Sequence, residues 1–467
     1  WSRIRAMHPK DERMGAFDAV MYDIEGDPLL RSAIVSFIVL DKAPDRQRLV
    51  ERTERLTRKF PRLRQRAVGN PFSPAPPRWE TDPNFDPAYH VRWRRLDESE
   101  ADLGGALVYA ARLGDGDFDH SRPLWEMSVL TGLDGGRAAV IFKVHHSVAD
   151  GMGSVAMSAS FFDLTPEEPD LGPLPPAPEA DPAGLLDRVR QATQFEIGAL
   201  GEVAVGSAKA YVRSIRSLVT NPVGSVVTTW RTTTSAAALL APQSDPLSTW
   251  MRGRSLTSAF TLLDVPLDKL KAAAHEAGVT LNIVFIAAVA DAIGIYHRQH
   301  DHPIDGFRIN MPISLRAPGD EATGNHWVPA RFIVPCGEKG PTTRLKQLVD
   351  VVDTARNDPA LGLAEGTYKV MALLPAPATE RLAGMMMKGV DVAATNVPGP
   401  PFPVFLAGAQ VTTLVPFAPK SGAAINIALL TYNGTANFGI NVDPAAVPDP
   451  DEFTACLAQA LAKYTED

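Results

Sequence analysis

The sequence has few cysteines, no long apolar run and no excess of positive charge, and each of these absences excludes a class of protein. The two cysteines among 467 residues, Cys336 and Cys456, cannot build a disulfide framework, which fits a reducing cytoplasm. No uncharged apolar run approaches the roughly 20 residues that a membrane-spanning helix needs. The formal net charge of -8 argues against nucleic acid as a partner of the whole molecule.

The N-terminal segment, Trp1 to Glu12, is polar and charged and lacks the apolar core of a signal peptide. We therefore expect a cytoplasmic protein that meets a membrane only at its surface. A hydrophobic fraction of 45% in a chain of this length can bury more than one core. Two lobes of about 200 residues each are the natural expectation.

One stretch carries an unusual combination of reactive side chains: Lys143-Val144-His145-His146-Ser147-Val148-Ala149-Asp150-Gly151. It follows an apolar run, Ala138 to Phe142, which is typical of a buried strand. The exit of a strand is a common place for reactive side chains, and an imidazole can act as a general base near neutral pH. Asp150 could fix the tautomer of a histidine directly, or it could hold the loop that presents the histidine.

Two adjacent histidines also suit a zinc site or a purely structural role. A zinc site requires a third ligand at a sensible spacing, but the sequence has no HExxH motif and no His or Cys cluster nearby. We therefore predict no metal, and acid–base catalysis is favoured over both alternatives.

The residues before the double histidine contain the elements of one lobe. The pattern predicts a helix from Phe17 to Glu25, a strand from Ala33 to Leu40 and a helix capped by Asp45. After the histidines, a further helix is predicted from Gly153 to Phe162. The helix capped by Asp45 has a strongly basic side, which is either a solvated face or a surface that attracts phosphate. The basic residues on and just after it are Arg46, Arg48, Arg52, Arg55, Arg58, Lys59, Arg62, Arg64 and Arg66.

A proline-rich segment, Asp163 to Gly184, marks the clearest boundary and is predicted to be a semi-rigid crossover. The residues that follow, 183–242, are helical by pattern. They form either a packed interlobe helix or an interfacial amphipathic helix.

The second half of the chain repeats the first in its elements. We predict a strand over Phe260–Leu263, a helix over Leu267–Ala277, and a hairpin of Asn426–Leu430 with Asn437–Val442 around the turn Asn433-Gly434. Two related lobes of sheet and helices follow from this repetition, and the first lobe carries the histidines.

These residues together resemble a known family. The double-histidine stretch fits the HHxxxDG motif of coenzyme A-dependent acyltransferases and peptide-synthetase condensation domains. With further motifs the chain, from about Phe17 to its C-terminus, resembles the bacterial wax ester synthase/diacylglycerol acyltransferase (WS/DGAT) family. Those motifs are Pro123-Leu124-Trp125-Glu126, the run from Arg308 to Arg316, Gly324-Asn325, the run from Thr395 to Pro400, Tyr432-Asn433-Gly434 and Phe438-Gly439.

Two stretches depart from the family pattern. Gly15-Ala16-Phe17-Asp18 stands where the family usually has Ser-Pro-x-Asp, and Asn282-Ile283 stands where it usually has Asn-Asp. The second change removes an acid that helps to define that motif.

The resemblance implies an α/β (α+β) fold of two chloramphenicol-acetyltransferase-like lobes, each a mixed sheet flanked by helices, with the active site at their interface. The implied division is an N-terminal acyltransferase lobe over residues 1–163 and a crossover linker over 164–184. A helical connection and a C-terminal acyltransferase-like lobe then occupy 185–467.

The resemblance also implies an O-acyltransferase. It would move a long-chain acyl group from acyl-CoA to a fatty alcohol or a diacylglycerol and make a wax ester or a triacylglycerol. No cofactor is implied besides acyl-CoA as a co-substrate. His146 would be the general base, Asp150 the organiser of the loop through Arg316, and His145 a supporting residue.

The implied substrate-binding residues are Gly151, Asn282, Thr395, Asn396 and Arg316, with Asn282 a candidate oxyanion donor and Thr395 and Asn396 behind it. The expected partners are acyl-CoA, the acceptor alcohol and the surface of the inner membrane or of lipid droplets. Two alternatives stay open: an acyltransferase of the same superfamily that acts on a carrier-bound or polyketide hydroxyl, and a catalytically weak lipid-binding homologue.

Overall fold

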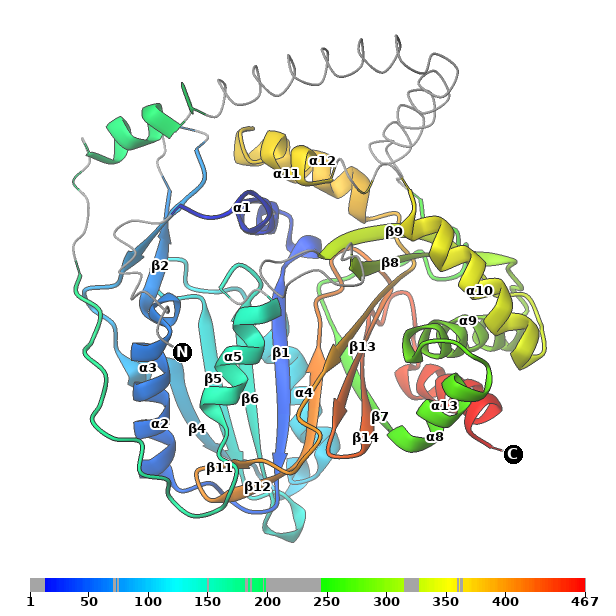
Figure 1. The fold of residues 1–467 in the computed structure, drawn as a ribbon, viewed down its shortest axis with the longest axis horizontal. Coiled ribbons are helices and arrows are strands. Elements are labelled where there is room, and N and C mark those ends of the chain that lie inside the picture. The colour runs from blue at the N-terminus through cyan, green and yellow to red at the C-terminus, as the bar shows by residue number, and fades with distance from the viewer. Residues whose placement is uncertain are drawn as a thin grey trace.

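Two six-stranded mixed sheets stand side by side in the protein, each with helices packed on it (Figure 1). The structure is a computed structural model. It describes residues 13–69, 73, 75–148, 151–180, 184, 187–195, 197–198, 245–314, 327–358, 361 and 364–466. The predicted two-lobe α/β architecture is confirmed.

The first sheet has the strand order β11-β12-β1-β6-β5-β4. Its central strand β1 pairs antiparallel with β6 on one side and with β12 on the other, and Ala33 at the start of β1 lies opposite His145 at the end of β6. The strands are β1 (Ala33–Leu40), β4 (Val91–Arg95), β5 (Trp125–Thr131), β6 (Ala138–His145), β11 (Phe405–Leu406) and β12 (Ala409–Phe417).

Helices cover both faces of the first sheet because its strands alternate two apolar sets. Val35 and Phe37 of β1 share a core with α4 (Leu103–Asp115), whereas Ile38 and Leu40 share one with α2 (Arg46–Lys59) and α5 (Gly151–Phe161). Asp45 caps α2 as predicted, because its carboxylate accepts the backbone N–H of Arg48.

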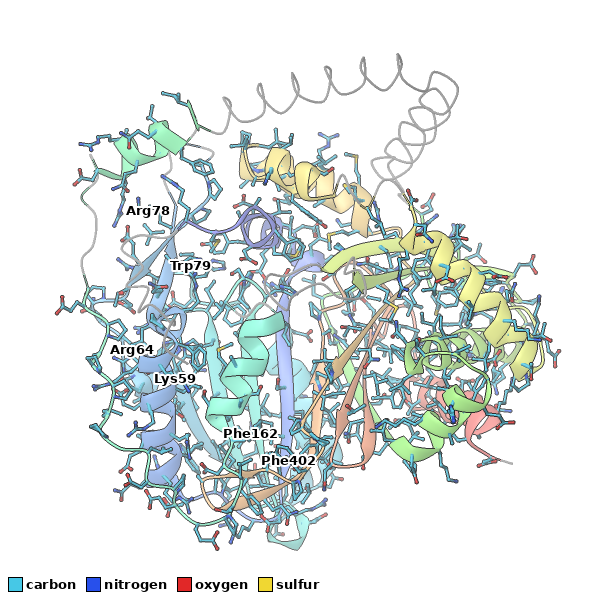
Figure 2. All side chains as sticks on the ribbon, in the orientation of Figure 1. Lys59, Arg64, Arg78, Trp79, Phe162 and Phe402 are labelled. Atoms are coloured by element: carbon cyan, nitrogen blue, oxygen red, sulfur yellow. The ribbon has the colours of Figure 1, made fainter. Side chains whose placement is uncertain are left out.

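A small antiparallel pair, β2 (Gln65–Val68) and β3 (Arg78–Thr81), and a short helix α3 (Pro87–His90) complete the first lobe. Figure 2 places Arg78 and Trp79 of β3 at the same end of α2 as Lys59 and Arg64. Trp79 is 2% exposed and carries the guanidinium of Arg62 on its ring, 4.4 Å from the centroid.

The second sheet has the strand order β7-β14-β13-β10-β8-β9. Its predicted hairpin is confirmed, since Asn433 and Gly434 both have positive φ and connect β13 to β14. The strands are β7 (Ala259–Pro266), β8 (Gly306–Ser314), β9 (Trp327–Pro335), β10 (Val392–Pro398), β13 (Ile425–Tyr432) and β14 (Thr435–Val442).

The helices of the second lobe pack on one face of this sheet around the most apolar helix, α9 (Leu281–Gln299). By length and composition α9 is the one helix among the described residues that could cross a membrane, but 83% of its apolar window is buried inside the lobe. It therefore serves as a core helix here. Around it lie α8 (Leu267–Glu276), α10 (Pro341–Arg356) and α13 (Pro450–Thr465).

The two sheets do not follow the two halves of the chain. Strands β11 and β12 lie within the second half of the sequence, yet β12 pairs with β1 of the first sheet, with Val35 opposite Phe417. The predicted assignment of all residues after 184 to one lobe therefore differs from the structure at Phe405–Phe417. The division at 163–184 otherwise stays a prediction, and the helices predicted over 183–242 fall almost entirely outside the described residues.

The basic side of α2 is neither simply solvated nor open to phosphate, because the crossover segment lies against it. Arg48 and Arg52 form ion pairs with Asp163, and the Arg55 guanidinium donates to the carbonyls of Leu171 (3.0 Å), Gly172 (2.6 Å) and Pro173 (3.0 Å). Arg58 likewise donates to the carbonyl of Pro175, at 2.9 Å. These guanidinium groups hold an irregular segment that has no helix or strand over the described residues 164–180.

Three helices lie together above the end of β6 where the double histidine begins: α1 (Ala16–Asp23), α11 (Ala364–Met371) and α12 (Ala376–Met387) (Figure 1). The first belongs to the N-terminal end of the chain and the other two to its second half. The candidate site is therefore roofed by segments that are far apart in the sequence.

Candidate active site

His145 is the last residue of β6, and its ring is completely buried. Its Nδ1 atom accepts the backbone N–H of Ser147 at 3.1 Å, and the Ser147 hydroxyl lies 2.6 Å from the same nitrogen. The rings of Tyr22 and Phe118 contact the imidazole edge to face, at centroid distances of 6.1 and 5.9 Å. His145 is therefore buried and bonded to Ser147 within the loop, and its supporting role in the reaction stays a prediction.

His146, the next residue, is only half-buried. Its backbone N–H donates to the carbonyl of Ser32 at 3.0 Å, which continues the pairing of β1 with β6 by one more bond. Its ring contacts Phe17 of α1 edge to face at 5.7 Å, and Phe17 in turn contacts Tyr368 of α11 at 5.0 Å. The alternation of the strand thus places one histidine in the core and the other under an aromatic roof.

Tyr368 adds a polar group to this roof. Burial raises the pKa of the Tyr368 hydroxyl to about 12, and the nearby Arg331 guanidinium opposes that rise only in part. The phenol is therefore neutral at neutral pH and can donate a hydrogen bond.

Asp150 and Arg316, the proposed loop organiser and its partner, lie outside the described residues. Gly151 is the first residue of α5, two positions before the predicted start of that helix. Gly151 therefore lies at the N-terminus of α5, and the place of Asp150 stays a prediction.

The predicted donors of the second lobe lie on its core helix, α9, and on strand β10 of the second sheet. Asn282 is the second residue of α9, and its Nδ2 atom lies 4.0 Å from the Met311 sulfur, whereas its Oδ1 atom is buried without a hydrogen-bond partner in the described part of the chain. Thr395 and Asn396 are half-buried on β10 opposite Ala428 and Leu429 of β13. Their roles stay predictions.

The residue after Asn282 is buried in apolar surroundings. Ile283 is 7% exposed and belongs to the core of the second lobe, together with Phe285 and Phe307. An aspartate at this position would place a carboxylate in that core, so the surroundings match the isoleucine that the chain has.

The Pro123 to Glu126 motif anchors the core beside the site. The Trp125 indole is 1% exposed, donates from Nε1 to the carbonyl of Leu63 at 2.7 Å and stacks on His90 at 4.5 Å. His90 Nδ1 lies 2.7 Å from the carbonyl of Trp125, and burial lowers the pKa of His90. Trp125 is thus an anchor of the core beside the site.

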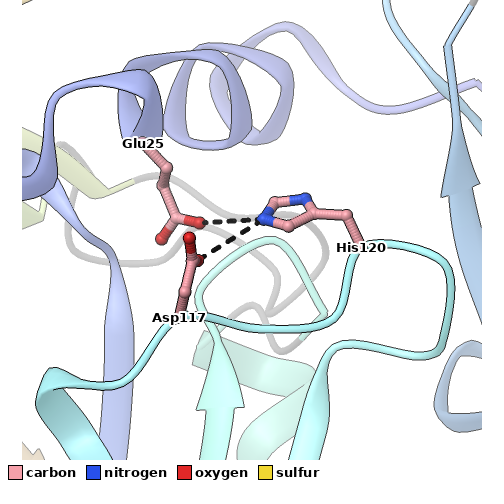
Figure 3. A group of neighbouring side chains, drawn as sticks. All are labelled: Glu25, Asp117 and His120. Atoms are coloured by element: carbon pink, nitrogen blue, oxygen red, sulfur yellow. Dashed lines mark ion pairs between the residues drawn. The ribbon is translucent and has the colours of Figure 1, made fainter.

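A polar cluster behind His145 was not predicted from the sequence. Glu25, just after α1, meets Asp117 and His120 from the loop after α4 (Figure 3). The Glu25 side chain is 5% exposed, and its Oε1 atom lies 3.1 Å from His145 Nε2. Nothing in the spacing of Glu25, Asp117 and His120 indicates that they meet, because the contact depends on how α1 and the loop after α4 pack.

The ligand atoms of Glu25, Asp117 and His120 lie within 4.8 Å of one another, so by distance they could hold a metal ion. Two cations already face this cluster. Arg31 Nη2 lies 3.4 Å from Asp117 Oδ2, and Lys143 Nζ donates to the carbonyl of Gly116 at 2.7 Å. Their positive charge opposes a divalent cation at the same place.

The fold and the site define a two-lobe acyltransferase with its histidine motif at the exit of a central strand. Comparison with protein families makes the class specific: the wax ester synthase/diacylglycerol acyltransferase catalytic domain matches residues 14–285, and the WS/DGAT C-terminal domain matches residues 323–464. The chain belongs to the WS/DGAT family and is an acyltransferase of that type.

Relatives and solved structures agree with this assignment. A Mycobacterium tuberculosis protein named as a putative diacylglycerol O-acyltransferase is 31% identical over 447 residues, covering 96% of this chain and 90% of that protein. The wax ester synthase/diacylglycerol acyltransferase of Marinobacter aquaeolei VT8 has a similar fold, with a TM-score of 0.62, 18% identity and coverage of 97% and 98%. The first condensation domain of the CDA synthetase follows, with a TM-score of 0.58, 18% identity and 97% coverage of both chains.

Proposed function

We propose that the protein transfers a long-chain acyl group from acyl-CoA to the hydroxyl of a fatty alcohol or a diacylglycerol, with His146 as the general base. The observation that carries this proposal is the unequal burial of the two histidines. The His145 ring is fully buried between Ser147, Tyr22 and Phe118, so it cannot reach a substrate. The residue His146 is half-buried, so of the two histidines it is the one that an acceptor hydroxyl can approach.

The reaction balances without a covalent enzyme intermediate. The acceptor O–H gives its proton to His146 while the oxygen attacks the thioester carbonyl, and the resulting oxyanion needs hydrogen-bond donors. When the C–S bond breaks, the thiolate of CoA leaves and takes the proton back from the imidazolium. The products are an ester and free CoA, and no cofactor takes part.

Asn282, Thr395 and Asn396 are the proposed donors to the oxyanion or to the substrates. An amide or a hydroxyl group stabilises such an oxyanion without changing its own charge. Asn282 is the strongest candidate, because its side chain is partly buried and its one hydrogen-bond contact within the described part of the chain is a long one, to the Met311 sulfur. Asp150, with Arg316, is proposed to organise the loop.

A long-chain acceptor is supported by the apolar roof over His146. Phe17 contacts the ring edge to face, Tyr368 contacts Phe17 in turn, and Leu382 and Met387 of α12 pack against the same core. Such surroundings favour alkyl chains over a polar carrier-bound acceptor. A substrate of this kind is held in lipid, so we also propose that the protein is cytoplasmic and works at the surface of the inner membrane or of a lipid droplet.

The test measures thiol release from palmitoyl-CoA with hexadecanol and, separately, with a diacylglycerol. His146→Ala is expected to lower kcat by about 10²- to 10⁴-fold, the usual contribution of a general base. His275→Ala is the matched control, because His275 is an exposed histidine of α8 in the other lobe. Equal turnover by the wild type and His146→Ala would exclude His146 as the base.

A second candidate, a lipid-binding protein with weak catalysis, is favoured by Ile283, which stands where the family has an acid. The same assay distinguishes the two. Binding of a fluorescent fatty acyl probe without thiol release from either acceptor would support this second candidate.

A further inference from the structure

We propose that Glu25 is the positioning residue of the double histidine: it holds the ring of His145 directly and the backbone of His146 through Ser32. The proposal rests on the acyl-transfer function proposed above, and it gives a role to the buried polar cluster behind the motif. Glu25 is buried and faces the buried ring of His145, so it acts through the histidines and not on the reacting atoms.

The backbone of His146 is connected to Glu25 by a single residue. Glu25 Oε1 accepts the backbone N–H of Ser32 at 2.7 Å, and the carbonyl of Ser32 accepts the backbone N–H of His146 at 3.0 Å. Ser32 itself is 1% exposed and immediately precedes β1. The buried Glu25 carboxylate thus holds the backbone of Ser32, and Ser32 holds the backbone of His146, the proposed base. The first of these bonds is charge-assisted, and such bonds are short and strong.

The ring of His145 is oriented by the same carboxylate. Its Nδ1 atom accepts an N–H from Ser147, so Nδ1 carries no proton and the neutral ring is protonated at Nε2. Nε2 lies 3.1 Å from Glu25 Oε1, although the angle is not that of a good hydrogen bond. The contact is therefore an electrostatic attraction between a ring N–H and a carboxylate, and it is strong because both side chains are shielded from water.

The second carboxylate oxygen of Glu25 has no hydrogen-bond donor in the described part of the chain and is buried. It lies 3.9 Å from His120 Nε2, which is also 3.6 Å from Asp117 Oδ1 (Figure 3). The hydroxyl oxygen of Tyr22 lies 3.1 Å from the other ring nitrogen of His120, Nδ1. His120 is partly exposed, so the chain of polar groups connects the buried motif to the surface.

Two cations facing the cluster make a buried carboxylate tolerable. The Lys143 side chain is 1% exposed, and burial lowers the pKa of its amine, whereas Glu126, Glu25 and Asp117 raise it. Arg31 pairs with Asp117. A buried carboxylate loses its hydration, and nearby positive charge offsets that loss. A buried carboxylate beside two histidines is therefore a candidate for a functional role.

The experiment compares Glu25→Gln with the wild type. Glutamine has the same shape and keeps an acceptor for the Ser32 N–H, but it removes the charge that faces His145. We expect the same thermal midpoint within about 2 °C, an unchanged KM for palmitoyl-CoA and a kcat lowered by about 10- to 100-fold, because only the alignment of the base is lost. Glu25→Asp, which restores the carboxylate, is expected to recover part of that loss.

The matched control is Glu126→Gln. Glu126 is a mostly buried carboxylate of the same sheet, with a side chain 13% exposed, and it pairs with Arg92 and Lys143 instead of a histidine. Its replacement is expected to leave kcat within twofold of the wild type.

A second readout does not depend on turnover. In protein labelled with ¹⁵N-histidine, the wild-type His145 ring is expected to give the nitrogen shifts of the Nε2–H tautomer, assigned with His145→Gln, and Glu25→Gln is expected to move them. Lack of turnover by the wild type would refute the proposed function, and the nitrogen shifts would still test Glu25. Unchanged kcat and unchanged shifts in Glu25→Gln would overturn the positioning role, as would activity that a chelator abolishes and added Zn²⁺ or Mg²⁺ restores, because the cluster would then be a metal site.

Discussion

The carbonyl oxygen of Pro416 lies where a Cβ atom on Gly439 would have to be. Pro416 belongs to β12 in the first sheet and Gly439 to β14 in the second, so the two sheets touch at a point that only glycine allows. Next to this contact, Asn426 and Asn441 of the second sheet donate to the carbonyls of Pro419 (2.8 Å) and Ala418 (3.0 Å), which follow β12. We call this contact between Pro416–Pro419 and the strands β13 and β14 the seam. The Phe438-Gly439 motif is thereby explained, because Phe438 faces the core of its own lobe and Gly439 faces the other lobe.

We predict that Gly439→Ala destabilises the protein by about 2–3 kcal/mol, since the added methyl group must displace backbone on the partner sheet. Differential scanning calorimetry should show the midpoint about 4–8 °C lower. Gly366→Ala is the control: Gly366 lies on α11 with no atom near the position of its Cβ. Equal midpoints for the two variants would mean that the two sheets can move apart at this seam without loss of stability.

This seam also shows what the sequence could and could not predict. The strand before the double histidine, the helix after it and the Asn433-Gly434 hairpin follow from local patterns, and the structure has all three. The pairing of β12 with β1 does not follow, because Val35 and Phe417 are far apart in the chain and an apolar strand does not specify its partner.

The residues of the candidate site also fall into two groups, those that the sequence predicts and those that only the packing brings together. His145 and His146 were found from residue types at adjacent positions, and their unequal burial follows from the alternation of a strand. Glu25, Phe17 and Tyr368 reach the site only through the packing of α1 and α11, and no periodicity in the sequence encodes that contact. The basic side of α2 is a similar case, because its partners are backbone carbonyls of the crossover, which no charge pattern shows.

Trp125→Phe is expected to lower the free energy of unfolding by about 1–3 kcal/mol, because it leaves the buried carbonyl of Leu63 without its donor and loosens the stack on His90. Thermal melts of the purified protein provide the measurement. Trp250→Phe is the control, since the Trp250 side chain is 37% exposed and stacks on His302 at the surface. If both variants had the same thermal midpoint as the wild type, the assignment of Trp125 as an anchor would be wrong.

Asp23 gives a prediction that depends on pH. Burial raises the pKa of this last residue of α1 from 3.8 to about 6, so the folded state keeps the proton over a range where the unfolded chain has released it. The stability that the group contributes is complete below the unfolded pKa and is lost as the pH rises through about 6. At neutral pH the ionised Asp23 therefore destabilises the folded protein.

Asp23→Asn removes this cost. We expect it to raise the free energy of unfolding by about 1 kcal/mol at pH 7.5, a figure reduced because the side chain is partly exposed to solvent, and by less at pH 5. Urea unfolding at the two pH values measures the difference. Asp353→Asn, at an exposed position of α10, should show no such dependence. A gain from Asp23→Asn that is larger at pH 5 than at pH 7.5 would contradict the burial of the carboxyl.

Arg55 tests whether the crossover is held by α2. Its guanidinium donates to three consecutive carbonyls, those of Leu171, Gly172 and Pro173, which have no strand or helix to satisfy them. Arg55→Ala is expected to favour local opening of the crossover by about 1–2 kcal/mol, which corresponds to cleavage roughly 5- to 30-fold faster when opening and closing are fast relative to cleavage.

Limited digestion with proteinase K, followed by mass spectrometry of the fragments, locates and times the cuts within residues 166–176. Arg46→Ala is the matched control, because Arg46 begins the same helix but places its guanidinium over the ring of Trp93, 5.2 Å from the centroid, and not on the crossover. Cleavage in this segment at the same rate in both variants would show that the remaining contacts, among them Arg58 to the carbonyl of Pro175, hold the crossover without Arg55. Faster cleavage in Arg55→Ala alone is the outcome we expect, since Arg55 donates to three consecutive carbonyls of the crossover and Arg46 contacts Trp93 instead.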